Sequence, residues 1–467
     1  MKNELKTKIV CTIGPSSWSK TVLKRMINAG MTVARVNGAY ADIEELQRVA
    51  VLIRSISSDV ALMLDIKGNN VRLNKFDAEI PLKVGQELIL GSSEKDYIYP
   101  MNYLELYKDL RPGSKIMFDD GNVKTVVEKI ENKKIFCRVI YGKTLKPGKS
   151  LNTPGTLLSL PPVNKRDKEQ IEFIKKDNWD FVAGSYIRGV EDVKEVRKYI
   201  KDSCVGLIAK IEEEFGVKNI DEILKEVDGV MIGRGDMGVE MPFEKIPAIQ
   251  KMIIQKCNYV GKPVITATQV MQSMVDNPLP TRAEISDAAN AVWQGTDAIM
   301  TSSETSTGKY PAETVWTIAR IAQEIEKDIK PELVMYQPDV PRLVNALTRA
   351  AYEVCQCINI AAVIIVTETG QTSRILGRHR IKQPIYAFVS EESYKRKLLL
   401  SKGISRAFVY SKNYTDRDTA LKSILNEVIR KRLISKNDLV IVIGGGLKKG
   451  SKFPNIFEIV DMKEFMA

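Results

Sequence analysis

The chain has very little histidine: a single residue, His379, in 467. It lies in the triplet Arg378-His379-Arg380, where the surrounding pattern predicts an exposed helix. One histidine nearly excludes histidine-based catalytic triads, histidine general bases elsewhere in the chain and histidine-rich zinc sites. We therefore expect any chemistry to use Lys, Arg, Asp, Glu and Thr side chains together with a metal held by oxygen ligands.

Long apolar runs are also missing. The longest, AAVIIV at 361–366 and LVIVI at 439–443, have the length of a strand and are far too short to span a membrane. The N-terminus, MKNELKTKIV, has no apolar signal core, so we expect a cytoplasmic protein with no membrane partner. The six cysteines are scattered and lack the spacing of a zinc knuckle, which predicts reduced thiols.

Negative charge is in deficit, with 58 Asp and Glu against 70 Lys and Arg, which gives a net charge of +12. A nucleic-acid partner would explain this surplus, and so would an enzyme for anionic phosphate substrates. No basic run is interleaved with aromatic side chains, so the pattern favours the enzyme and no nucleic-acid partner.

A chain of 467 residues is too long for one ordinary core, which predicts two or three domains. Short β-branched runs alternate with amphipathic stretches, as is typical of parallel strands joined by crossover helices. Eight such runs predict an α/β fold with a closed (β/α)8 TIM barrel, although an open doubly wound sheet would show the same alternation. The runs are 8–13, 32–37, 60–65, 180–184, 205–210, 229–233, 263–267 and 297–300.

Two further modules interrupt and follow the barrel. Residues 74–159 carry short alternating strands with Asp-Gly and Glu-Asn turn signals, which predict a small all-β lid domain inserted in a barrel loop. A C-terminal α/β open-sheet domain, 338–467, follows a proline-containing link. The barrel itself would comprise 1–73 and 160–337. The strands of the last domain are expected at 361–366, 384–389, 406–410, 439–443 and 457–460.

Polar side chains gather at the carboxyl ends of the predicted barrel strands, the rim at which barrels place their active sites. Glu212 and Asp236 offer hard oxygen ligands suited to Mg²⁺ or Mn²⁺. Lys and Arg side chains beside them would neutralise a phosphoryl group in transfer. Any one of these residues would be an ordinary surface charge, but their repetition at strand ends predicts a phosphoryl-transfer site. The basic and hydroxyl residues at these ends are Arg35, Lys67, Arg72, Lys210 and Thr268.

Two segments, LIAKIE at 207–212 and DGVMIGRGDMGVEMP at 228–242, resemble the most diagnostic motifs of pyruvate kinases. The resemblance implies an enzyme of glycolysis that transfers the phosphoryl group of phosphoenolpyruvate to ADP, giving pyruvate and ATP. It also implies a homotetramer, Mg²⁺ or Mn²⁺ as cofactor, a β-barrel lid and a regulatory or oligomerisation domain at the C-terminus. Further matching segments are TKIVCTIGPSS at 7–17, VITATQVMQSM at 264–274, PTRAEISDAAN at 280–290 and SSETSTGKYP at 302–311.

The resemblance assigns roles to single residues. Lys210 would stabilise the transferring phosphoryl group and the enolate oxygen, Arg35 would contact the phosphate, and Thr268 would lie near the methylene carbon that is protonated. Glu212 and Asp236 would bind the divalent metal. The implied substrate-binding residues are Lys210, Gly235, Asp236, Thr268, Ser185 and Arg35, with the amides of Gly235 and Asp236 receiving the substrate carboxylate.

The resemblance also implies a nucleotide site closed by the inserted lid, since water must be kept from the phosphoryl group. Two of its residues would come from the lid and three from the barrel. They are Asp120 and Lys149 in the lid, and Arg35, Asn37 and Arg72 in the barrel.

Three segments depart from the family pattern. The usual Arg-x-Asn-Phe-Ser-His-Gly reads RVNGAY at 35–40, where Ala39 supplies no hydroxyl to a monovalent cation. The usual Asp-Thr-Lys-Gly-Pro-Glu reads DIKGNN at 65–70, where Asn70 removes a carboxylate tied to potassium dependence. The usual Ser-Gly-Glu-Thr reads SSET at 302–305. Asn37 and Asp65 remain as possible ligands, so we expect K⁺ to bind weakly and to be dispensable.

The segment TETGQTS at 367–373 offers hydroxyls and a glycine before a helix, which would suit a phosphate and equally an ordinary capped helix start. In the family this position forms part of an effector site. The expected effector residues are Thr367, Thr369, Gly370 and Thr372, and the carboxylate of Glu368 favours a monophosphate over a bisphosphate.

Two functions of different class remain. One is an active pyruvate kinase, and the other is a catalytically weakened relative kept as a regulatory or binding subunit, which the three departures suggest. Lys210, Glu212, Asp236 and Thr268 are all present, so the sequence favours the active enzyme.

Overall fold

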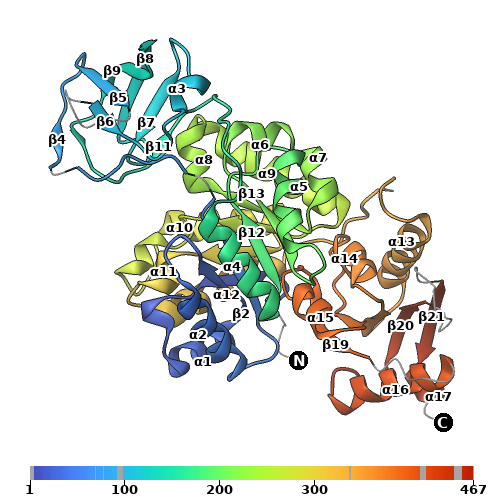
Figure 1. Cartoon of the computed structure of the whole chain (residues 1–467). Coiled ribbons are helices and arrows are strands. Elements are labelled where there is room, and N and C mark those ends of the chain that lie inside the picture. The colour runs from blue at the N-terminus through green and yellow to red at the C-terminus, as the bar shows by residue number, and fades with distance from the viewer. Residues whose placement is uncertain are drawn as a thin grey trace.

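A computed structural model of the chain describes residues 5–68, 70–76, 78–91, 98–335, 338–410, 417–445 and 455–465. A barrel occupies the centre of an elongated molecule, with a β-rich insertion at one end and a C-terminal α/β module at the other (Figure 1). The predicted fold class is confirmed. Within the described residues, no helix is both long enough and apolar enough to cross a membrane.

Eight parallel strands close into a barrel in the order β1-β16-β15-β14-β13-β12-β3-β2, which excludes the open sheet. Each predicted run contributes one strand. The side chains of these strands are almost all buried, because their outer faces are covered by helices and their inner faces fill the barrel. The strands are β1 (Lys8–Thr12), β2 (Met31–Asn37), β3 (Ala61–Asp65), β12 (Phe181–Gly184), β13 (Gly206–Ile211), β14 (Gly229–Gly233), β15 (Val264–Ala267) and β16 (Ala298–Thr301).

The helices around the barrel begin where the sequence offers caps. Asp42 accepts a hydrogen bond from the Glu45 amide, and Thr281 forms a capping box with Glu284. Their apolar residues pack on the outer face of the sheet as one cluster. The helices are α1 (Lys20–Ala29), α2 (Ile43–Arg54), α4 (Lys165–Lys176), α5 (Val190–Ile200), α6 (Glu214–Lys218), α7 (Ile220–Glu226), α8 (Arg234–Glu240), α9 (Ile246–Val260), α10 (Arg282–Gln294), α11 (Ser303–Ser306) and α12 (Pro311–Glu326).

The insertion forms a six-stranded sheet, β11-β7-β8-β9-β5-β6, and a two-stranded ribbon, β10-β4, around its own apolar core. Asn132 and Lys133, both in the left-handed region at φ 50° and 63°, turn the chain at the predicted Glu-Asn signal. The elements are β4 (Ile80–Pro81), β5 (Glu87–Gly91), β6 (Ile98–Pro100), α3 (Leu106–Asp109), β7 (Lys115–Phe118), β8 (Val123–Glu131), β9 (Lys134–Tyr141), β10 (Thr144–Leu145) and β11 (Leu151–Asn152).

The C-terminal module is an open sheet in the order β19-β18-β17-β20-β21, in which only the pairing of β20 with β21 is antiparallel. All five predicted strands are present. The elements are α13 (Arg342–Cys357), β17 (Ala362–Val366), α14 (Gln371–Gly377), β18 (Ile385–Val389), α15 (Glu392–Leu398), β19 (Ile404–Val409), α16 (Arg417–Arg430), β20 (Leu439–Gly444), β21 (Ile456–Asp461) and α17 (Met462–Phe465).

The barrel and the C-terminal module share buried polar contacts. Lys8, which is only 4% exposed at the start of β1, donates to the Ile404 carbonyl at 2.6 Å. Asp180, at the start of β12, accepts from Arg396 of α15 at 2.7 Å. These contacts tie the amino-terminal ends of the barrel strands to the last module.

The prediction that His379 lies on an exposed helix is wrong. The residue follows α14, its side chain is fully buried, and its Nδ1 accepts a hydrogen bond from the Val334 amide at 3.0 Å. Nε2 therefore carries the proton of the neutral ring. Burial and the nearby Arg378 lower the pKa of His379 to about 4.

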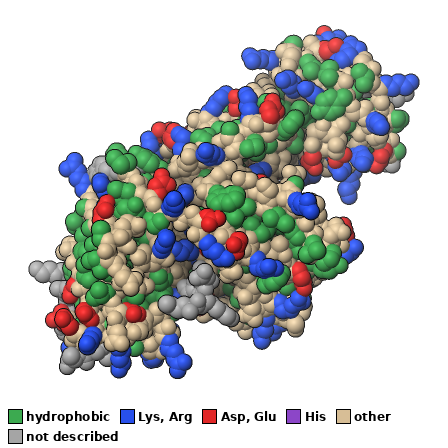
Figure 2. Space-filling model, turned by 180° about the vertical axis from the view of Figure 1, so that it is seen from behind, with side chains coloured by type: hydrophobic (Ala, Val, Ile, Leu, Met, Phe, Trp, Pro, Cys, Tyr) green, Lys and Arg blue, Asp and Glu red, His purple; other side chains and the backbone are tan. Residues whose placement is uncertain are grey.

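The positive surplus of the sequence is spread over the molecule. On the face shown in Figure 2, Lys and Arg side chains lie among acidic and hydrophobic ones rather than in one continuous basic stripe.

Candidate active site

A cavity of about 250 Å³ opens at the carboxyl ends of the barrel strands. It is the edge at which the sequence placed the polar residues, because parallel strands all end on the same rim. The predicted residues that line it are Arg35, Asn37, Asp65, Lys67, Arg72, Ser185, Lys210, Glu212, Asp236 and Thr268.

Lys210 lies at the centre of this cavity. Its Nζ is 3.0 Å from Glu212 Oε1 and 3.1 Å from Asp65 Oδ1, and it donates to Ser185 Oγ at 2.8 Å. Alternation along β13 turns Lys210 and Glu212 to the same side of the strand. Burial opposes the charge, but Asp65, Glu212 and Asp236 outweigh it and raise the pKa of Lys210 above its usual value. The ammonium group is therefore fixed and permanently charged.

Arg35 and Asp65 form a buried pair beside it. Asp65 Oδ2 accepts from Arg35 Nη2 at 2.6 Å and from Nε at 3.0 Å, while Nη1 donates to Thr12 Oγ1 at 2.8 Å. Burial alone would raise the pKa of Asp65, but Lys210 and Arg35 hold it below the usual value. Asp65 is thus an ionised carboxylate already shared between two cations.

Glu212 and Asp236 lie on either side of Tyr186. The Tyr186 hydroxyl donates to Asp236 Oδ1 at 2.8 Å, and its amide donates to Glu212 Oε2 at 2.9 Å. Gly233 permits this approach, since a Cβ there would come within 2.6 Å of Glu212 Cγ. Burial and then the nearby Asp236 raise the pKa of Glu212 to about 7, against the opposing effect of Lys210.

The donor set of this pair fits a hard divalent cation. Both carboxylates contact Tyr186; Glu212 is buried and Asp236 is half-buried, and a cation held by both would offset the cost of keeping the buried Glu212 ionised. The described part of the chain holds no group of three or more His, Cys, Asp or Glu side chains that could enclose a metal. Mg²⁺ or Mn²⁺ here would accordingly take its remaining ligands from water and substrate oxygens.

The backbone at Thr268 is strained. Thr268 and Gln269 both adopt left-handed conformations, with φ of 67° and 52°, which cost a β-branched residue on the order of 1–3 kcal/mol. Arg234 holds the turn, since its Nη2 donates to the Thr268 carbonyl at 2.7 Å and its Nη1 lies 2.8 Å from Asp287. The Thr268 hydroxyl accepts a hydrogen bond from the Gly235 amide at 2.8 Å, which fixes the orientation of this side chain in the cavity lining.

Comparisons with known proteins place this site in a family. The sequence model of the pyruvate kinase barrel domain matches residues 4–315, and that of the pyruvate kinase alpha/beta domain matches residues 345–460. The chain belongs to the pyruvate kinase family. Like its family, it is a phosphotransferase.

Relatives and solved structures agree over nearly the whole chain. A pyruvate kinase of Geobacillus stearothermophilus is 39% identical over 94% of this chain and 77% of its own length. One of Clostridium acetobutylicum is 37% identical over 94% of this chain and 96% of its own. The crystal structure of a pyruvate kinase from Cryptosporidium parvum superposes with a TM-score of 0.90 at 33% identity, covering 98% of this chain and 96% of the other.

Two residues assigned to the nucleotide do not line the cavity. Lys149 lies 2.8 Å from the carboxylate of Asp119, and Asp120 accepts from the Ser150 hydroxyl at 2.9 Å within the insertion. A role for Asp120 and Lys149 stays a prediction, and it requires the insertion to approach the barrel.

The two departures near the expected potassium site line the cavity. Ala39 presents only a methyl group, and its amide donates to Asn37 Oδ1 at 3.1 Å. Asn70 Oδ1 is buried and has no hydrogen-bond partner among the described residues. This oxygen is available to a ligand, whereas Asn37 Oδ1 is already engaged.

The expected effector residues follow β17. Gly370 caps α14 at φ 83°, where a Cβ would come within 2.6 Å of Leu398, so glycine is required. Thr372 is 2% exposed, while Thr369 is exposed to solvent. A phosphate site at Thr367, Thr369, Gly370 and Thr372 stays a prediction.

Tyr186 is the residue of this cavity that sequence reasoning missed. It follows Ser185 directly beyond the end of β12, and its φ of 52° is unusual for an aromatic residue. A hydroxyl-bearing aromatic residue at a strand end was the available signal, although its hydrogen bond to Asp236 crosses 50 positions of sequence.

Proposed function

We propose that this protein transfers the phosphoryl group of phosphoenolpyruvate to ADP, giving pyruvate and ATP, with Mg²⁺ or Mn²⁺ as cofactor. The observation that carries the proposal is the Lys210 ammonium, only 13% exposed and held between Asp65 and Glu212 in a cavity that Asp236 also lines. The names of the relatives support the same reaction.

Each side chain has a part suited to that chemistry. Lys210 supplies a fixed positive charge at the transferring phosphoryl group and then at the enolate oxygen. Arg35 adds a second cation, held in orientation by Asp65 and Thr12. Thr268, aimed by its strained backbone, would position the proton donor for the methylene carbon, through water. A bound divalent metal, held by Glu212 and Asp236, would neutralise negative charge on substrate oxygens.

The nucleotide would enter from the side of Arg72 and Asn37, which line the same cavity. Closure of the insertion over it would bring Asp120 and Lys149 closer and exclude water. Ser185, which accepts from Lys210, would help to line the substrate pocket.

The alternative is a catalytically weakened relative. The departures at Ala39 and Asn70 lie beside the centre, and none of them removes a contact of Lys210. An active enzyme that binds K⁺ weakly, or does not need it, is therefore the better-supported hypothesis.

The proposal is tested by an assay coupled to lactate dehydrogenase, which reports pyruvate, with phosphoenolpyruvate, ADP and Mg²⁺. We expect turnover that needs both substrates and stops when a chelator is added in excess of the metal. Absence of pyruvate formation at saturating substrates would favour the weakened relative. The expected homotetramer is a separate prediction, which light scattering measures.

A further inference from the structure

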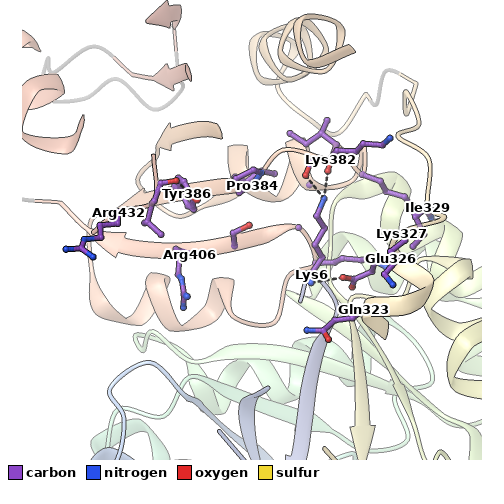
Figure 3. A pocket seen from close by; sticks show the side chains of 18 residues that line it. Lys6, Gln323, Glu326, Lys327, Ile329, Lys382, Pro384, Tyr386, Arg406 and Arg432 are labelled. Atoms are coloured by element: carbon purple, nitrogen blue, oxygen red, sulfur yellow. Dashed lines mark hydrogen bonds between the residues drawn. The ribbon is translucent and has the colours of Figure 1, made fainter. Parts of the chain in front are cut away.

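A second and larger cavity, of about 650 Å³, lies between the barrel and the C-terminal module (Figure 3). Lys6 and the end of α12 form the barrel side. The starts of β18 and β19 and the turn after α16 form the other side. It is remote from the loop 367–373, because that loop follows the carboxyl end of β17 and the parallel strands begin at the opposite edge of the sheet.

The lining of this cavity is strongly basic. Glu326 is its one acidic residue, and its two carboxylate oxygens already accept from the backbone amides of Lys6 at 3.0 Å and Thr7 at 2.6 Å. A concave site lined by one sign of charge concentrates ions of the other sign. The basic lining residues are Lys6, Lys327, Arg380, Lys382, Lys402, Arg406 and Arg432.

Three of these cations are held by neutral carbonyl groups. Lys6 Nζ donates to the carbonyls of Ile381 at 2.7 Å and of Lys382 at 3.0 Å (Figure 3). Lys402 Nζ donates to the Val292 carbonyl and Arg380 Nη2 to the Gln294 carbonyl, each at 3.3 Å.

Burial disfavours the charged forms of Lys6 and Lys402 more than the nearby Glu326 favours them. Burial, together with the charges of Arg380 and Lys6, lowers the pKa of Lys402 to about 8, against the opposing effect of Glu326 and Asp297. Burial likewise lowers the pKa of Lys6. An anion in the cavity would offset this repulsion among like charges.

Apart from Gln323 and Ser405, the rest of the lining is largely apolar. Ile329 on the barrel side and Pro384, Ile385 and Leu433 on the other present hydrocarbon, and the ring of Tyr386 borders the same space. A volume of about 650 Å³ falls within the ~300–1,000 Å³ of ordinary small-molecule sites. Such a pocket suits a ligand with a charged end and an organic body.

We propose that this cavity binds a small organic phosphate with at least two negative charges, which bridges the barrel and the C-terminal module. Arg380, Arg406 and Arg432 bring guanidinium groups to the lining, a planar group suited to pairing with phosphate oxygens, and the lysines add point charges. Arg406 and Arg432 lie at the end of the cavity away from Lys382, so the ligand would span it (Figure 3). Because both modules contribute, an occupant would stabilise their junction.

The test is direct binding, which does not depend on the proposed reaction. Adenosine 5′-monophosphate, glucose 6-phosphate and pyrophosphate are titrated into the full chain by calorimetry, and the thermal unfolding midpoint is recorded with each. We expect at least one of the two organic phosphates to bind below millimolar concentration, more tightly than pyrophosphate, and to raise the midpoint.

Two cavity variants and two controls locate the site. Lys402→Met removes the central charge, and Lys382→Glu reverses an exposed charge at the rim without burying a new group. Each is expected to weaken binding about tenfold or more, the effect of losing one charge-assisted hydrogen bond. Lys330→Glu makes the same charge change on an exposed residue outside the cavity, and Thr367→Ala alters the other candidate loop.

Retained binding in both controls, with loss in Lys382→Glu, supports the proposal. Equal loss in Lys330→Glu would show that only net charge matters, and loss in Thr367→Ala alone would place the ligand at that loop. Either outcome overturns the proposal, as does failure of all three probes, or pyrophosphate binding as tightly as the organic phosphates.

Discussion

Replacing Lys210 with methionine separates the chemical role of this residue from its structural one. The change removes the ammonium group 3.0 Å from Glu212 Oε1 and 3.1 Å from Asp65 Oδ1. Asp65 keeps Arg35, but Glu212 has no other ion-pair partner in the described part of the chain. A pair of unit charges 3.0 Å apart is worth about 5 kcal/mol at an effective dielectric constant of ~20.

Two losses are expected from Lys210→Met. Phosphoryl transfer should fall by at least about 10²–10³-fold, the cost of one preorganised charge at a transition state. The free energy of unfolding should fall by about 3–5 kcal/mol, as for other buried pairs that lose one member. Glu212 can escape this cost by taking up a proton, so the destabilisation should be smaller at pH 6 than at pH 8.

The double variant Lys210→Met/Glu212→Gln tests this account. Without an unpaired carboxylate it should recover most of the lost stability and none of the activity. All four tryptophans, Trp18, Trp179, Trp293 and Trp316, lie in the barrel, so their fluorescence follows unfolding of that module alone. Activity is measured in the coupled assay at saturating phosphoenolpyruvate and ADP.

Two results would refute the reasoning. Near-normal turnover of Lys210→Met would show that the ammonium group does not act on the substrate. A double variant no more stable than the single one would show that the uncompensated carboxylate of Glu212 is not what destabilises Lys210→Met.

Three further expectations concern other parts of the molecule. Tyr186→Phe removes the hydrogen bond to Asp236 and should raise the Mg²⁺ concentration for half-maximal rate by about tenfold, with the unfolding midpoint little changed; an unchanged metal titration would contradict this. Because folding favours the neutral form of His379, the free energy of unfolding should fall by about 3 kcal/mol as pH falls from ~6.5 to 4. The resonance of the single histidine in an NMR titration should show a pKa near 4, and a pKa near 6.5 would contradict the buried ring. Replacing tetramethylammonium chloride with KCl at constant ionic strength should change turnover little, because Ala39 offers no hydroxyl to the cation. A many-fold rise in turnover would mean that the unpaired Oδ1 of Asn70 completes a cation site.

The barrel and the C-terminal sheet could be predicted because both depend on local pattern. Buried parallel strands appear in the sequence as short β-branched runs, and eight of them favour a closed barrel, although only the structure excludes the open sheet. The rim residues were predictable for the same reason, since the end of a run fixes where Lys210 and Asp236 must lie. The burial of His379 was not predictable, because the segment that covers it, around Val334, is 45 positions away.

The cavity at the junction of the modules escaped the sequence entirely. Its walls come from Lys6, from the end of α12 and the residues just after it, and from scattered residues between 377 and 433, none of which forms a motif in the sequence. They form a cavity only because the barrel and the C-terminal module pack together, and the hydrophobic periodicity of the sequence does not predict how two modules pack. Tyr186 illustrates the same limit within the active-site cavity, because its hydroxyl matters only once Asp236 is placed opposite it.

The contact between Lys8 and the Ile404 carbonyl has a consequence for the order in which this chain can fold on a ribosome. The first strand emerges early, but its barrel neighbour β16 follows almost 290 residues later, and the carbonyl that receives Lys8 arrives 396 positions after it. Until then the barrel lacks the module that covers this end of its strands, and the side chains buried against that module stay exposed to water. A chain truncated before α13 would remain in that state permanently, and it should be more prone to aggregate than the size of its core would suggest.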